Sequence, residues 1–150
     1  MKLPQKRDIN AGASKQTNGM KAEMSPKPRI LFVEDDQDSR EVTCLFLKSQ
    51  GFQVICADNA SQALQIAKDQ HVDAYLLDNW LPEVSGPELC RQIRRFDSHT
   101  PVVFYSAAGH ATDQEAALNA GAQFYIVKPV EPDDLVNALR SVMPCWNPLG

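Results

Sequence analysis

Short apolar runs alternate along this chain with longer segments in which apolar residues recur at helical spacing. Four of the runs span about four residues each, and a fifth begins near residue 53. The four are Ile30–Val33, Ala74–Leu77, Val102–Tyr105 and Phe124–Val127. Runs of this length between helical patterns are typical of buried strands in a parallel sheet. We therefore predict five strands.

The segments between and after the strands carry apolar residues on one helical face, and each has a start or stop signal. The expected helices cover residues 37–49, 60–69, 87–95, 113–120 and 132–142. Asp36, Asn59 with Gln62, and Thr112 with Glu115 stand where helix caps are expected. Pro87 and Pro132 suit first helical positions, and Gly51 and Gly121 suit helix ends.

Five strand–helix units in a row predict an α/β fold, a doubly wound five-stranded parallel sheet with helices on both faces. Right-handed crossovers and this number of strands favour the flavodoxin-like strand order 2-1-3-4-5. The switch point of that order lies between the first and third strands, and ligands bind there, outside the carboxyl ends of the strands.

Polar residues follow four of the strands directly. They are Glu34-Asp35-Asp36, Asp78, Ser106 and Lys128-Pro129. Although these residues are spread over almost a hundred positions, the predicted topology brings them to one edge of the sheet. An inventory of carboxylates, one hydroxyl and one lysine suits a metal ion and a phosphoryl group.

The carboxylates call for a cation. Two unit charges about 4 Å apart repel by about 4 kcal/mol at an effective dielectric constant near 20. A hard divalent ion with oxygen ligands, above all Mg²⁺, relieves that repulsion. We expect Glu34, Asp35 and Asp78 to hold it, with the backbone carbonyl near Trp80 and water. The alternative is a solvated acidic turn that caps the next helix, a role we assign to Asp36.

Asp78 is also a candidate nucleophile, since carboxylates form acyl phosphates that a metal ion and a lysine stabilise. Lys128 is that lysine, because it follows a strand and precedes Pro129, which turns the chain away from helix and permits a cis bond. Ser106 can donate its hydroxyl to a phosphoryl oxygen. Taken alone, Lys128 could be a surface lysine and Ser106 a strand-end turn residue.

These motifs together resemble the receiver domain of two-component response regulators over about residues 29–143. The matching segments are Ile-Leu-Phe-Val-Glu34-Asp35-Asp36, Leu-Leu-Asp78-Asn-Trp-Leu-Pro82-(x)3-Gly86, Phe-Tyr-Ser106-Ala107 and Tyr125-Ile-Val-Lys128-Pro129. Each motif is weak alone, but all of them in order at strand ends make a specific signature.

The resemblance implies that Asp78 accepts phosphate from a sensor histidine kinase or a phosphotransfer protein. Glu34 and Asp35 would hold Mg²⁺, and Lys128 would pair with the phosphoryl group. Ser106 would move toward that group and Tyr125 would rotate inward behind it. This coupling would change the face of the fourth helix, fifth strand and fifth helix, through which members of the family form homodimers.

Three positions depart mildly from the family pattern. Serine stands at position 106 where threonine is commoner, and Glu34 is a frequent alternative at the first acidic position. Trp80, two residues after the acceptor, is bulky at a position that influences phosphate hydrolysis in the family, and its ring would either shield or crowd the phosphoryl group.

We expect a signalling protein and not an enzyme. The enzyme alternative is an aspartyl-phosphate phosphohydrolase or phosphotransferase. Haloacid-dehalogenase-like enzymes carry a second Asp two residues after the nucleophile, and Trp80 stands there instead. A receiver-like binding module that is never phosphorylated is the third alternative; it should have lost an acidic residue or the lysine, and this chain keeps them.

Composition sets the boundaries of the domain. Residues 1–29 carry a net charge of +5 and residues 30–150 one of −9. The acidic body argues against nucleic-acid binding. We expect residues 1–28 to be a disordered basic leader, with a binding arm as the alternative, and 144–150 to be a C-terminal tail. With no output domain in the sequence, the chain is either a stand-alone regulator with an unknown protein target or a piece of a larger protein.

The remaining sequence features point to the cytoplasm. No apolar stretch approaches the roughly 20 residues of a membrane span, and the N-terminus lacks a secretory signal. The four cysteines form no C-x-x-C pair, so we expect free thiols in a reducing compartment rather than disulfides or a zinc site.

Overall fold

The computed structural model describes residues 26–143, which form five strands and five helices. The predicted tail and all of the predicted leader except residues 26–28 lie outside this range. The strands are β2 (Arg29–Val33), β3 (Gln53–Ala57), β4 (Ala74–Leu77), β5 (Val102–Ser106) and β6 (Phe124–Val127). The helices are α3 (Gln37–Ser49), α4 (Ala60–Asp69), α5 (Gly86–Arg94), α6 (Ala111–Asn119) and α7 (Pro132–Val142).

All five strands belong to one parallel sheet in the order β3-β2-β4-β5-β6. This is the predicted order 2-1-3-4-5, so the predicted fold class is confirmed. The first strand, β2, pairs with β3 on one side and with β4 on the other, and the chain therefore reverses its direction of winding between β2 and β4.

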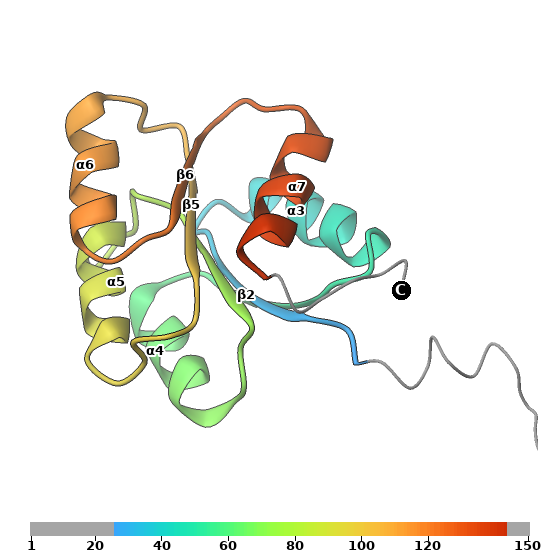
Figure 1. The fold of residues 1–150 in the computed structure, drawn as a ribbon, viewed down its shortest axis with the longest axis horizontal. Coiled ribbons are helices and arrows are strands. Elements are labelled where there is room, and N and C mark those ends of the chain that lie inside the picture. The colour runs from blue at the N-terminus through green and yellow to red at the C-terminus, as the bar shows by residue number, and fades with distance from the viewer. Residues whose placement is uncertain (1–25, 144–150) are drawn as a thin grey trace, which may run out of the picture.

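Two helical layers cover the sheet, with α3 and α7 on one face and α4, α5 and α6 on the other (Figure 1). Successive side chains of a strand point to opposite faces. Thus Leu31 and Val33 of β2 pack with the layer of α4, α5 and α6, and Ile30 and Phe32 pack with the layer of α3 and α7. Burial on both faces explains why the strands are continuous apolar runs without an alternating polar pattern.

Local signals set most helix ends. Asp36 caps α3 by accepting a hydrogen bond from the Ser39 amide at 2.8 Å, and Asn59 caps α4 in the same way from Gln62. The predicted Thr112 cap is wrong: α6 begins at Ala111, and His110 is the N-cap. The Asp113 carboxylate accepts from the His110 amide at 3.1 Å, which stabilises this earlier start.

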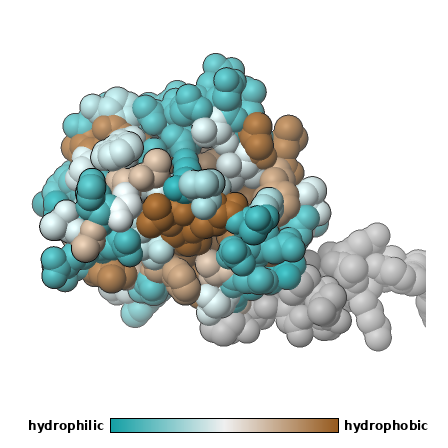
Figure 2. Space-filling model, turned by 90° about the horizontal axis from the view of Figure 1, so that it is seen from above, coloured by the Kyte–Doolittle hydropathy of each residue, from teal (hydrophilic) through white to brown (hydrophobic). Residues whose placement is uncertain are grey.

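The face seen in Figure 2 has a hydrophobic patch near its middle, surrounded mostly by hydrophilic residues, with smaller hydrophobic areas toward the edges. Within residues 26–143, no helix is both long and apolar enough to cross a bilayer. The cysteines of this range are free thiols, with Cys90 buried and Cys44 and Cys56 half-buried. The fourth, Cys145, lies outside the described residues.

Candidate functional site

Strand register brings the predicted site residues together. Val33 at the end of β2 pairs with Leu77 at the end of β4, so Glu34 and Asp78 leave the sheet from adjacent positions. On the other side of β4, Ser106 pairs with Val127, and the Lys128 amide donates to the Ser106 carbonyl at 2.9 Å. The switch point of the sheet therefore lies at the predicted residues.

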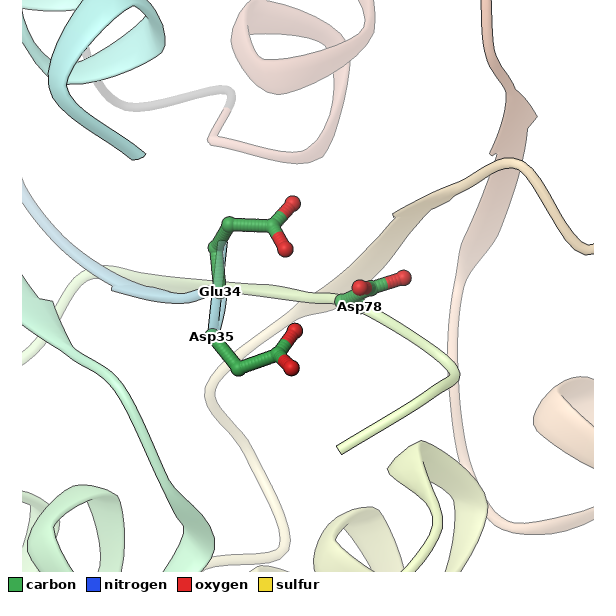
Figure 3. Close-up of side chains that lie close together, drawn as sticks. All are labelled: Glu34, Asp35 and Asp78. Carbon is green, nitrogen blue, oxygen red and sulfur yellow. The ribbon is translucent and has the colours of Figure 1, made fainter. Parts of the chain in front are cut away.

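Three carboxylates meet at this edge. One carboxylate oxygen from each of Glu34, Asp35 and Asp78 can be chosen such that all three lie within 4.8 Å of one another. Figure 3 shows the two side chains after β2 and the one after β4 grouped around a shared space. Glu34 and Asp78 are buried, whereas Asp35 is exposed. An all-oxygen donor set open to solvent on one side fits Mg²⁺, which retains several waters.

Lys128 supplies the positive charge of the site. Its Nζ lies 2.7 Å from Glu34 Oε1 and 4.8 Å from the centre of the Tyr105 ring. Glu34 is only 2% exposed, and a carboxylate buried to this degree needs a partner. The peptide bond from Lys128 to Pro129 is cis, as the sequence analysis allowed. Lys128 is therefore part of the pocket, and its partner in this structure is Glu34.

The acidic loop is fixed by backbone contacts that the sequence analysis did not identify. The Arg40 guanidinium donates to the carbonyls of Glu34 at 2.9 Å and Asp35 at 3.3 Å. Glu34 Oε2 accepts from the Asp36 amide at 3.2 Å. Arg40 follows Asp36 by four residues and lies on the first turns of α3, a spacing that returns its side chain to the loop before the helix.

The loop after Asp78 folds back on itself. Asp78 Oδ1 accepts from the Asn79 amide at 2.8 Å, and the Asn79 carbonyl accepts from the Gly86 amide at 2.7 Å. Gly86 is required here, because a Cβ atom would lie 2.7 Å from Phe104 Cε2 and closer still to the Asp78 carbonyl oxygen. Trp80 is 61% exposed beside this loop.

Asn79 is buried in this loop although its neighbour Trp80 is exposed. Asn79 is only 6% exposed. Its side-chain amide donates to the Tyr125 hydroxyl at 3.0 Å, and this long-range partner is what draws it inside. Nothing in the local sequence around Asn79 indicates that contact.

Ser106 and Tyr125 lie behind the carboxylates. Ser106 is fully buried, and its Oγ accepts from the Ala108 amide at 3.2 Å. The Tyr125 hydroxyl donates to the Ala108 carbonyl at 2.5 Å, and its ring stacks on Phe104 with 5.5 Å between centroids. Burial raises the pKa of Tyr125, against the opposing effect of the hydrogen bond from Asn79. Both predicted switch residues therefore contact the turn after β5.

Comparison with known proteins identifies the family. Residues 30–140 match the family model of the response regulator receiver domain. The chain is 38% identical over 120 residues to the transcriptional regulatory protein CseB of Streptomyces coelicolor. The matched region covers 80% of this chain and 51% of CseB. The chain is 35% identical over 115 residues to the DNA-binding response regulator MtrA of Mycolicibacterium smegmatis, covering 77% of this chain and 50% of MtrA.

Solved structures agree with this assignment. The CheY-like receiver domain protein of Methanospirillum hungatei superposes with a TM-score of 0.76 at 28% identity, over 79% of this chain and 95% of that one. The response regulator TrrA of Thermotoga maritima, solved in complex with Mg²⁺ and BeF, gives a TM-score of 0.71 at 26% identity, over 77% and 98%.

This chain belongs to the receiver domains of response regulators, the signalling proteins of two-component systems. It spans about half the length of the curated relatives that it matches.

Proposed function

We propose that this receiver domain is switched by transfer of a phosphoryl group to Asp78 from a sensor histidine kinase or a phosphotransfer protein. The observation that carries the proposal is the cluster of Glu34, Asp35 and Asp78 beside Lys128, in which one carboxylate oxygen from each residue lies within 4.8 Å of the other two. Such a cluster attracts a divalent cation, and with the cation in place an anionic donor can approach a carboxylate.

Glu34 and Asp35 would hold Mg²⁺ together with Asp78 and the backbone carbonyl of Trp80. When bound, the ion would neutralise charge on the phosphoryl oxygens. The Asp78 carboxylate would attack phosphorus, and the bond to the donor's nitrogen would break as the new P–O bond forms. Asp78 is only 7% exposed, but Asp35 beside it is exposed, so a donor side chain would approach Asp78 from the Asp35 side of the cluster.

Lys128 would change partner during this reaction. Its ammonium group now balances the buried carboxylate of Glu34 at 2.7 Å. Once Glu34 has a cation as its counter-charge, Lys128 would be free to contact the phosphoryl oxygens. Ser106 would turn its hydroxyl toward the same oxygens. It would then lose the hydrogen bond that its Oγ now accepts from the Ala108 amide.

The change would be transmitted to the face of α6, β6 and α7. An open groove of about 510 Å³ lies along β6 and α7 on this face. Its lining includes Phe124, Ile126, Val130, Ala138 and Ser141. Tyr125 also lines it and contacts the Ala108 turn, so a change at that turn reaches the groove directly. A second copy of the chain, forming a homodimer, or a downstream protein would bind here. We propose that this domain does not contact nucleic acid or membrane directly.

The test is phosphate incorporation measured on the intact protein. With acetyl phosphate and Mg²⁺, the wild-type protein should gain the mass of one phosphoryl group, and chelation by EDTA should prevent the gain. Asp78→Asn should gain none, because an amide oxygen is a poor nucleophile. The matched control is Asp69→Asn, which removes an exposed carboxylate at the end of α4. Labelling that persists in Asp78→Asn would show that another residue is the acceptor.

A further inference from the structure

A continuous path of hydrogen bonds connects Asp78 with Tyr125, and it runs through Asn79. The Asn79 amide donates to Asp78 Oδ1 at 2.8 Å. The side chain of the same residue donates through Nδ2 to the Tyr125 hydroxyl at 3.0 Å. Asn79 therefore contacts the proposed phosphoacceptor with its backbone and the proposed switch tyrosine with its side chain.

The surroundings of Asn79 hold it in one orientation. The residue is 94% buried, and its carbonyl accepts from the Gly86 amide at 2.7 Å, where Gly86 cannot carry a side chain. Buried polar groups are almost always hydrogen-bonded, because leaving one unpaired destabilises the fold. Tyr125 is the partner that satisfies the Asn79 side-chain donor in this structure.

Tyr125 is held inward from both sides of its oxygen atom. A phenol has one proton to donate, and Tyr125 gives it to the Ala108 carbonyl while it accepts from Asn79. The ring is stacked on Phe104 of β5, with only 6° between the ring planes.

We propose that Asn79 is a positioning residue that holds Tyr125 inward and connects the Asp78 loop to the Tyr125 hydroxyl. Ser106 reaches the same turn by another contact, since its Oγ accepts from the Ala108 amide. Two contacts thus converge on Ala108, one from Ser106 and one from the Tyr125 hydroxyl, and Asn79 connects the second of them to the Asp78 loop. The proposal rests on the proposed function, because the signal that Asn79 would transmit to Tyr125 is the phosphorylation of Asp78.

The first test uses the full chain labelled with fluorotyrosine and observed by ¹⁹F NMR. The chain contains three tyrosines, so single Tyr→Phe variants assign every signal. Asn79→Leu retains the approximate side-chain volume and removes the donor. Without Mg²⁺ or a phosphoryl mimic, its Tyr125 signal should differ from wild type by more than the line width, and Mg²⁺ with beryllofluoride should move it back toward the wild-type position. A Tyr125 signal that coincides with wild type before addition would overturn the proposal.

The second test reads the same bond from the other side and does not depend on Asn79→Leu folding. In a ¹⁵N-labelled Tyr125→Phe variant, the Asn79 side-chain amide should change its chemical shift and exchange faster with solvent, because its acceptor is gone. Tyr75→Phe is the matched control, since that hydroxyl donates to Asp97 and does not contact Asn79. An Asn79 amide with wild-type shift and exchange in Tyr125→Phe would refute the proposal.

These spectra are recorded before phosphorylation, and so they separate the two proposals. If Asp78 gains no phosphate but Asn79→Leu still moves Tyr125, the proposed function fails and the Asn79 contact stands. If Asp78 is phosphorylated and neither spectrum changes, the proposed function stands and the role of Asn79 is refuted.

Discussion

At the scale of single residues, the pocket is governed by how buried charges are balanced. Glu34 is buried, and its ion pair with Lys128 at 2.7 Å joins residues 94 positions apart in sequence. Removing one member of a buried pair leaves the other charge without compensation, which costs more than the pair itself contributes. The Lys128 side chain is 22% exposed, so solvent screens part of that effect.

Lys128→Met should therefore lower the free energy of unfolding without Mg²⁺ by about 1–2 kcal/mol. Mg²⁺ affinity should be retained or increased, because the change removes a competing cation and not a ligand. The response of the amide NMR spectrum to beryllofluoride should be lost. Lys68→Met is the matched control, as Lys68 also lies over an aromatic ring, Phe96, but away from the three carboxylates. An intact beryllofluoride response would leave Lys128 a purely structural role.

The sequence was sufficient to locate the residues that follow the strands directly and insufficient for two residues that support them, Asn79 and Arg40. Glu34, Asp78 and Lys128 follow apolar strands directly, so topology alone predicts that they converge. Asn79 and Arg40 depend on contacts whose direction is set by tertiary packing: Asn79 reaches a tyrosine 46 residues away, and Arg40 turns back to two loop carbonyls. Neither residue type is unusual at its position, so periodicity and motif spacing leave both unassigned.

At the scale of elements, strands were predicted almost to the residue and helix starts less well. Apolar runs have clear edges in the sequence, since a polar residue follows each run directly. Helix starts depend on which of several side chains captures the free amides. In α6, Thr112 and His110 both stand near the start, and the Asp113 carboxylate decides between them through the His110 amide. In α3 only Asp36 is placed to cap, and the prediction was correct.

The loop between α5 and β5 provides a pH-dependent prediction at this scale. Asp97 accepts hydrogen bonds from the amides of His99 and Thr100 at 3.1 and 3.0 Å and from the Tyr75 hydroxyl at 3.0 Å. Burial alone would raise the pKa of Asp97, but the hydrogen bonds from Thr100, His99 and Tyr75 outweigh it and lower the pKa from 3.8 to about 2. A carboxyl whose pKa is lower in the folded state stabilises the fold above its unfolded pKa.

Asp97→Asn should accordingly lower the free energy of unfolding at pH 7, by about 1 kcal/mol once solvent screening is included. The difference from wild type should shrink as the pH falls from about 4 to about 2, because wild-type Asp97 then takes up its proton. Urea unfolding of both proteins at pH 7 and pH 3 measures this. Tyr75→Phe removes one of the partners and should retain most of the pH dependence. If the difference in the free energy of unfolding between the two proteins does not change with pH, the Asp97 charge does not stabilise the loop.

At the scale of the whole molecule, the proposed metal site connects the two strands on either side of the switch point of the sheet. Glu34 and Asp35 follow β2, and Asp78 follows β4, and these strands lie on the two sides of the switch point. The strand ends in turn support both helical layers, because residues of β2 and β4 pack into each core. A cation shared by the three carboxylates would bind only when both strands are in place, so its binding free energy would add to the stability of the whole domain.

Mg²⁺ should therefore raise the melting temperature of the protein saturably. At ten times the dissociation constant the added stability is about 1.4 kcal/mol, which corresponds to roughly 5 °C for a domain of this size. Asp35→Asn should reduce the shift strongly, because it removes the exposed ligand without opening a cavity in the core. The same variant should melt at or above the wild-type temperature in EDTA, since one of three mutually repelling charges is gone. Asp69→Asn, which removes a carboxylate outside the cluster, should retain the full response. If Asp35→Asn and Asp69→Asn respond equally to Mg²⁺, the ion screens the acidic surface in general and does not bind at the three carboxylates.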